Sequence, residues 1–296
     1  MGAPSVAMAS CECNALRITV GRQYSGAPRA PRDAIHGVET DPHTLATAVE
    51  MFAPLARYHR LKVSGLENIP RGPALFVANH SGGLHPVDAL FLFRYYEQYG
   101  YDDPIFVLAH DLLFEVPRVS DLLNSIGAIR ASEGRGKELL RAGHKLLVFP
   151  GGDLDNMRAF SRRREVVFGG RSGFVRLARG AGVPIIPVVS AGAHETFVVL
   201  TQGRRLAKFM GLPKRLRVNS CPIVLAAPWG VLWGPGMLLP YLPLPSKVTV
   251  QVGRTIDLSA APLLSLGEGP AAEHVRAAMQ DLLEGMYAER RYPVLG

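Results

Sequence analysis

The sequence predicts an α/β protein whose central sheet is mixed, largely parallel and flanked by helices. Two observations support this fold class. Uninterrupted short apolar runs, typical of strands covered on both faces, alternate with segments whose apolar residues recur at helical spacing. The chain also has 296 residues, of which 48% are hydrophobic, and this is enough for a sizeable core.

The first predicted element starts at Asp41, which we place as a helix N-cap with Pro42 in the first turn. Apolar residues at helical spacing then predict an amphipathic helix over residues 41–59. The preceding residues 1–40 contain no sustained periodicity and carry Gly, Pro and Arg. We expect them to form a disordered tail, followed by a single domain over residues 41–296.

The rest of the chain alternates between predicted strands and helices. Strands are expected at 61–65, 74–78, 105–109, 128–130, 145–149, 183–189 and 247–252, and helices at 87–96, 119–123, 133–142, 173–181 and 271–290. In such sheets, ligands bind where the strands reach their carboxyl ends. His80, Arg130 and Gly151 all lie near such ends.

The composition indicates the class of partner and the redox compartment of the protein. The formal net charge of +8 and a pI of about 9.6 favour an anionic partner: a membrane surface, a nucleic acid or a phosphorylated substrate. We expect no nucleic acid, since the chain lacks a recognisable reader motif and basic strands interleaved with aromatics. The cysteines, Cys11, Cys13 and Cys221, form neither a paired framework nor a zinc-binding spacing, which predicts a reducing compartment.

The most informative stretch follows the apolar run 74–78. His80 comes first, then two glycines, and then Pro86 and Asp88. A neutral imidazole with a carboxylate in reach can remove a proton from a hydroxyl, so we interpret His80 as a general base that Asp88 orients. His85 is an alternative base. Each residue alone also fits a structural role, as a strand-end cap or as a charge at a helix N-terminus.

Asn79-His80 with Asp88 resembles the first motif of the phospholipid/glycerol acyltransferase family, which includes lysophosphatidic acid acyltransferases. Three further blocks resemble its later motifs in order, within a similarity that covers roughly residues 60–255: Gly-Ala-Ile-Arg-Ala-Ser at 127–132, Phe-Pro-Gly-Gly-Asp-Leu-Asp at 149–155 and Val-Pro-Ile-Ile-Pro-Val at 183–188. The resemblance implies the family's mixed α/β fold. It also implies transfer of a fatty acyl group from acyl-CoA or an acyl-carrier protein thioester to a hydroxyl of a glycerolipid or lysophospholipid.

Several substrate-binding residues follow from these blocks. The resemblance implies that Arg130 contacts a phosphate of the acceptor, although a surface salt bridge would also account for it. Gly151 and Gly152 offer backbone N–H groups to an oxyanion or phosphate, or form an ordinary turn. Arg158 is a candidate second anion contact. Asp155 stands where the diacylglycerol acyltransferase branch has a Glu after Pro-Gly-Gly, and we include it among the acceptor-binding residues.

The sequence departs from the family pattern in two places. Seven residues separate His80 from Asp88, whereas the family usually has four between them. The third motif reads Pro-Gly-Gly instead of Pro-Glu-Gly, which resembles the diacylglycerol acyltransferase branch. The altered spacing supports an alternative function, a non-catalytic lipid-binding protein of the same fold.

A membrane contact is predicted near the end of the chain. Residues 218–246 carry no charged side chain and include Trp229, Trp233 and Tyr241, but their prolines and glycines make the segment too broken for a spanning helix. The stretch before it, residues 204–217, is basic and amphipathic. This combination predicts an interfacial anchor on an anionic membrane surface at the cytoplasmic face. The alternative is a buried, proline-rich core segment beside a solvated basic helix.

The sequence as a whole therefore predicts a peripheral membrane acyltransferase. General-base acyl transfer needs no metal and no organic cofactor, so we expect none besides the acyl-CoA or acyl-carrier protein thioester, which is a co-substrate.

Overall fold

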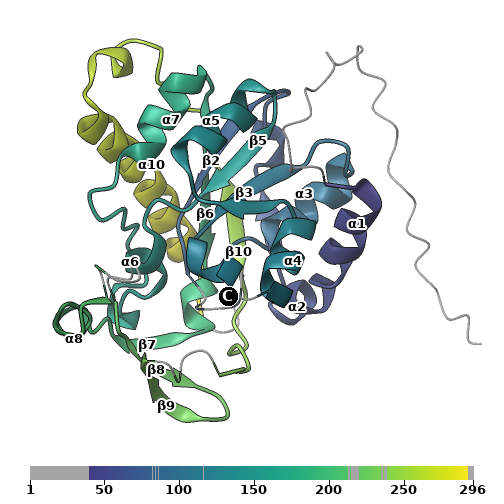
Figure 1. The fold of residues 1–296 in the computed structure, drawn as a ribbon. Coiled ribbons are helices and arrows are strands. Elements are labelled where there is room, and N and C mark those ends of the chain that lie inside the picture. The colour runs from purple at the N-terminus through teal and green to yellow at the C-terminus, as the bar shows by residue number, and fades with distance from the viewer. Residues whose placement is uncertain are drawn as a thin grey trace, which may run out of the picture.

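The computed structural model describes residues 40–81, 83, 85, 87–115, 117–212, 214, 220–234, 236 and 239–292. Of the predicted tail, residues 1–39 lie outside the described residues. The described part builds a seven-stranded sheet between two layers of helices, with a separate three-stranded sheet at one end (Figure 1).

The central sheet has the strand order β1-β10-β6-β2-β5-β3-β4. Its strands are β1 (Lys62–Ser64), β2 (Ala74–Ala78), β3 (Ile105–Ala109), β4 (Ala128–Arg130), β5 (Lys145–Val148), β6 (Ile185–Ala191) and β10 (Thr249–Val252). The strands from β6 to β4 run parallel, β10 is antiparallel to β6, and β1 is parallel to β10. The predicted mixed, largely parallel sheet is confirmed.

Helices cover both faces of this sheet. The helices are α1 (Pro42–Glu50), α2 (Ala53–Tyr58), α3 (Phe91–Tyr99) and α4 (Pro117–Ser125) on one side, and α5 (Glu133–Arg141), α7 (Gly173–Ala181) and α10 (Glu268–Glu289) on the other (Figure 1). Along β2, Leu75 and Val77 enter the core beneath α5, α7 and α10, whereas Phe76 enters the core beneath α1 and α3. Burial on both faces is why this strand reads as a continuous apolar run.

The predicted helix over residues 41–59 is wrong in one respect, because it is two helices. Asp41 caps α1 as expected, since its Oδ2 accepts a hydrogen bond from the N–H of Thr44 at 2.8 Å. The chain then turns at Met51 and Phe52 before α2. Pro54 explains the break, because it has no N–H to continue the ladder of α1 and is tolerated only in the first turn of a helix.

The small sheet was not predicted. It consists of β7 (Val198–Thr201), β8 (Ile223–Ala226) and β9 (Gly230–Trp233), all antiparallel, with α8 (Arg204–Phe209) beside β7 (Figure 1). Its strands are four residues long and apolar on both faces, so they lack the alternation that identifies a half-buried strand. Among the described helices, none has the length and apolarity needed to cross a membrane.

The small sheet has two apolar faces. One packs on a buried cluster formed by Met157, Phe197, Val199, Val224, Ala226 and Tyr241. The other exposes Leu200, Leu225, Val231 and Trp233, whose exposed fractions lie between 43% and 61%. We call these four residues the outer face of the small sheet. An antiparallel sheet normally presents polar side chains to water, so this face is unusual for a solvent-covered surface.

Candidate active site

The candidate site lies at the edge of the central sheet where the parallel strands end. His80 follows β2, Pro150 follows β5, and Arg130 ends β4. Ala109 of β3 pairs with Arg130 of β4, and residues 105–107 of β3 pair with residues 145–147 of β5. Continuing this second register by two residues places Phe149 opposite Ala109, and therefore level with Arg130. Since positions at one level project from the same face of a sheet, these two side chains share a face.

His80 and Asp88 meet directly. The Nδ1 atom of His80 lies 2.6 Å from Oδ2 of Asp88, and the N–H of Ser81 donates to the same oxygen at 2.7 Å. The Asp88 side chain is 1% exposed, whereas the His80 side chain is 26% exposed. A proton on Nδ1 leaves Nε2 as the basic nitrogen of the neutral ring. The seven intervening residues therefore do not prevent the predicted contact between His80 and Asp88.

Neighbouring charges change the pKa of His80. Burial alone would lower the pKa of His80, but the negative charge and hydrogen bond of Asp88, with a contribution from Asp155, raise it above its usual value. The ring of Phe149 lies at 4.5 Å from the His80 ring, between centroids, and covers part of it. Imidazolium is therefore stabilised in a site that is only partly open to water.

His85, the alternative base, is placed differently. Its ring meets the Tyr241 ring edge-on at 4.5 Å between centroids, and burial lowers its pKa. Gly83 explains how the loop packs there. Its φ is +69°, and a Cβ atom at this position would come within 2.4 Å of the Tyr241 hydroxyl and 2.8 Å of Phe197. The structure thus pairs Asp88 with His80 and directs His85 toward the small sheet.

Asp155 and Arg158 are buried beneath His80 rather than exposed to a substrate. Asp155, in α6 (Gly152–Asn156), is 0% exposed, and Arg158 is 1% exposed. Asp155 accepts from the N–H of His80 at 2.5 Å, and Arg158 donates to the carbonyl of His80 at 3.2 Å and to Asp155 Oδ1 at 2.6 Å. The expectation that both contact the acceptor does not fit this burial, because their polar atoms are already engaged inside the protein.

The two glycines of the third motif form a packed turn. A Cβ atom on Gly151 would lie 2.1 Å from the carbonyl oxygen of Val167, and one on Gly152 would lie 2.6 Å from Arg171. The N–H of Gly152 donates to the carbonyl of Phe149 at 3.0 Å, so it is not available to an oxyanion. Close packing accounts for both glycines, which corrects the interpretation of Gly152 as an oxyanion or phosphate donor.

Arg130 is half exposed at the far strand of the same edge. Its guanidinium donates to Glu115 Oε1 at 3.0 Å and lies over the Phe114 ring, 5.2 Å from the centroid. The side chains of Arg130 and Glu115 are 46% and 63% exposed. The salt bridge that the sequence analysis kept as an alternative is therefore present, and it leaves the guanidinium within reach of solvent.

Comparison with known proteins adds the family. A family model described as Acyltransferase matches residues 60–191. The uncharacterized protein Rv0502 of Mycobacterium tuberculosis is 32% identical over 265 residues, which are 85% of this chain and 69% of that protein. The chain belongs to the acyltransferase family. The match covers all four sequence blocks, including His80, Asp88, Arg130 and Asp155, and it ends before the small sheet.

This acyltransferase is also similar to an enzyme of lipid synthesis and to a solved acyltransferase structure. The mouse protein named DGAT1/2-independent enzyme synthesizing storage lipids is 32% identical over 197 residues, which are 66% of this chain and 56% of that enzyme. The crystal structure of PlsC, the 1-acyl-sn-glycerophosphate acyltransferase of Thermotoga maritima, has a TM-score of 0.50 at 19% identity. The structural match covers 82% of this chain and 79% of the PlsC chain, so the two proteins share a fold.

Two asparagines of the acyltransferase support the site and were not predicted as such. The side chain of Asn79 donates to the carbonyl of Ser190 at 3.0 Å and accepts from its N–H at 2.8 Å, which ties the end of β2 to β6. Asn156 makes the same pair of bonds with Gly83, at 2.9 and 3.0 Å. Asn79 is adjacent to His80 in the motif, whereas no sequence signal identifies Asn156.

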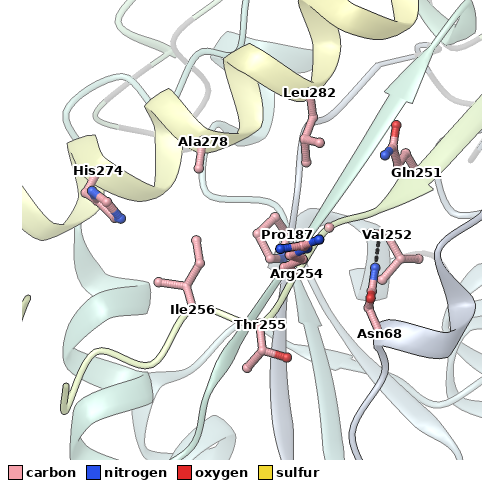
Figure 2. A pocket seen from close by; sticks show the side chains of 11 residues that line it. Asn68, Pro187, Gln251, Val252, Arg254, Thr255, Ile256, His274, Ala278 and Leu282 are labelled. Atoms are coloured by element: carbon pink, nitrogen blue, oxygen red, sulfur yellow. Dashed lines mark hydrogen bonds between the residues drawn. The ribbon is translucent and has the colours of Figure 1, made fainter.

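A cavity of about 380 Å³ lies elsewhere on the acyltransferase, between α10 and the end of β10 (Figure 2). Leu282, Ala278 and Ile256 form apolar walls, and Arg254 and His274 lie among them. The predicted site residues do not line this cavity.

Proposed function

We propose that this acyltransferase moves a fatty acyl group from a thioester to a hydroxyl of a glycerolipid or lysophospholipid, with His80 as general base. The observation that carries the proposal is the 2.6 Å contact between Nδ1 of His80 and buried Asp88 at the carboxyl edge of the sheet. With Nδ1 engaged by this contact, Nε2 is the ring nitrogen left to act as the base, and the His80 side chain is 26% exposed. The contact also weakens the non-catalytic alternative, because that alternative depended on the altered His–Asp spacing.

The reaction needs one proton to move twice. Nε2 of His80 takes the proton of the acceptor hydroxyl while that oxygen attacks the thioester carbonyl. The new C–O bond forms, the C–S bond breaks, and the imidazolium returns its proton to the departing thiolate. Asp88 stabilises the imidazolium in between. General-base help of this kind contributes about 10²–10⁴ in rate.

The donor and acceptor classes follow from the family and from Arg130. The donor is acyl-CoA or an acyl-carrier protein thioester, as in the family that the sequence resembles. Arg130 lies three strands from β2, about 14 Å at the usual strand spacing, and on the face that carries Phe149. An acceptor whose hydroxyl reaches His80 can extend an anionic headgroup toward this guanidinium, with the phosphate replacing Glu115.

The proposal includes an anionic membrane surface. The outer face of the small sheet is apolar, and α8 beside it exposes Arg204, Arg205 and Lys208 together with Phe209, which is 90% exposed. An apolar face flanked by cations suits the interface of an anionic bilayer, where each cation adds about 1 kcal/mol. Placement of this surface at the cytoplasmic face remains part of the proposal.

A purified-enzyme screen tests the reaction. Thiol release from acyl-CoA is measured with lysophosphatidic acid, other lysophospholipids, glycerol phosphate or diacylglycerol, each against a control without acceptor. We expect release that depends on one of these acceptors and an esterified product of matching mass. Thioester loss that is independent of every acceptor would contradict acyl transfer.

Liposome flotation tests the membrane contact. We expect the protein to float with vesicles that contain anionic lipid and to lose most of this binding when Trp233 and Val231 are replaced by Ser. Leu232→Ser on the opposite side of β9 is not a suitable control, since it packs against the buried cluster. Leu264→Ser is the matched surface control, because Leu264 is an apolar residue that is also exposed, at 62%, and lies outside the small sheet. Absence of binding to anionic and neutral vesicles alike would contradict the anchor.

A further inference from the structure

The loop that carries His80 is held from below by three side chains of one short segment. Asp155 accepts from the N–H of His80, and Arg158 donates to the carbonyl of the same residue. Asn156 binds both the N–H and the carbonyl of Gly83. The peptide groups on both sides of the candidate base are therefore positioned by α6 and the residues directly after it.

These side chains have no polar atoms to spare for a ligand. Arg158 donates to four carbonyl oxygens and to Asp155, and Asp155 Oδ1 also accepts from the N–H of Val167 at 3.1 Å. The four carbonyls belong to His80, Asp155, Arg162 and Arg163. An arginine with this many backbone acceptors, buried in the protein, organises the chain around it.

We propose that Asp155, Asn156 and Arg158 are positioning residues that set the backbone of His80 and of Gly83 and thereby aim Nε2 at the reacting hydroxyl. The inference rests on the proposed function, with His80 as base. It also accounts for the long interval between His80 and Asp88. Asp88 fixes the His80 ring and the N–H of Ser81, while Asp155 and Arg158 fix the N–H and the carbonyl of His80. These contacts set the position of His80 whatever the number of residues before Asp88.

The Asp155–Arg158 pair also allows a test that a purely structural pair would not pass. Beside the effects of burial and of Asp88, Asp155 raises the pKa of His80 and Arg158 lowers it. Other titratable groups that interact electrostatically with this cluster are His194, Arg163, Glu165 and Tyr287. Of these, His194 is buried after β6, and burial holds its pKa well below the usual value. His194 therefore stays neutral and does not obscure the two opposite effects.

The experiment compares the pH dependence of kcat/KM for three variants. Asp155→Asn is expected to move the acid limb to lower pH, and Arg158→Gln is expected to move it to higher pH. The double variant, which removes both charges, is expected to return the limb close to its original position. In each case kcat falls, by about 10²-fold where the base is misplaced by about an ångström, while KM for the thioester changes little.

Controls keep the result interpretable. Asp153→Asn neutralises an acid of the same helix whose partner is Arg171 at 2.9 Å, and it should leave the limb in place. If a single variant does not fold, the double variant and Asn156→Leu test the inference instead, because neither leaves an unpaired buried charge. Asn156→Leu should lower kcat and leave KM unchanged. Folded single variants with unmoved limbs, or a fully active Asn156→Leu, would overturn the inference. A fully active His80→Ala would instead overturn the proposed function.

Discussion

The sequence predicts that Arg158 and Arg130 both contact an anionic group of the acceptor, but the structure gives the two arginines opposite environments. Arg158 is 1% exposed and lies 2.6 Å from Asp155, with four backbone carbonyls taking its other donors. Arg130 is 46% exposed and pairs with Glu115, which is itself 63% exposed. The number of buried backbone acceptors, rather than the position after a strand, separates an arginine that builds the site from one that can meet a substrate.

The loss of the buried ion pair of Arg158 and the loss of the exposed ion pair of Arg130 have different effects on stability and on substrate binding. Breaking a buried ion pair by removing one partner costs about 3–5 kcal/mol of stability, because the remaining charge has no compensation. An exposed pair contributes about 0–1 kcal/mol, so exchange of Glu115 for a phosphate is inexpensive. The comparison therefore predicts stability effects at Arg158 and substrate effects at Arg130, and substitutions can separate the two.

The largest effect is expected from Arg158→Met. We expect the free energy of unfolding to fall by about 3–5 kcal/mol, since Asp155 is left buried and unpaired. Chemical denaturation of the variant and of Arg130→Met measures the difference, and the Arg130 substitution should cost less than about 1 kcal/mol. Equal losses for the two variants would contradict the distinction between them.

Asp88→Asn tests the buried side without removing the hydrogen bond to His80. Because the charge of Asp88 raises the pKa of His80, the acid limb of kcat/KM should lie above pH 6.5 in the wild type and move to lower pH in the variant. We expect kcat to fall by about 10²-fold, since the imidazolium loses its stabilising charge. An unchanged limb in a pH–rate profile would show that another group controls it.

Arg130→Ala tests the exposed side. With a phosphorylated acceptor, we expect KM for the acceptor to rise about tenfold while kcat and thermal stability change little, because one charge-assisted hydrogen bond is lost at a partly exposed site. Steady-state kinetics with acceptor as the varied substrate measures this. An unchanged KM would indicate a neutral acceptor.

The smallest effect is expected from Glu115→Gln. Removing the carboxylate leaves the Arg130 guanidinium without its competing anion, so KM for a phosphorylated acceptor should fall by a few fold. The same kinetic assay compares the variant with Arg130→Ala, whose effect has the opposite sign. A rise in KM for both variants would mean that Glu115 holds Arg130 in its working position.

Local signals predicted much of this molecule, and tertiary contacts explain what they missed. The uninterrupted apolar run of β2 and the side chain of Asp41 carry their structural consequences in the neighbouring residues. The role of Asp155 cannot be predicted from its neighbours in the sequence, because its partner His80 is 75 positions earlier and only folding brings the two residues together. The small sheet was missed for a related reason, since an apolar outer face removes the alternation that would have identified its strands.

The central claim is that His80, held by Asp88, is the base for acyl transfer, and His80→Gln beside His85→Gln tests it most directly. Acceptor-dependent thiol release from acyl-CoA is measured for both purified variants after confirming that each unfolds like the wild type. We expect His80→Gln to lose at least about 10²-fold in kcat and His85→Gln to remain within about tenfold of the wild type. Wild-type rates in His80→Gln, or a loss confined to His85→Gln, would contradict the assignment.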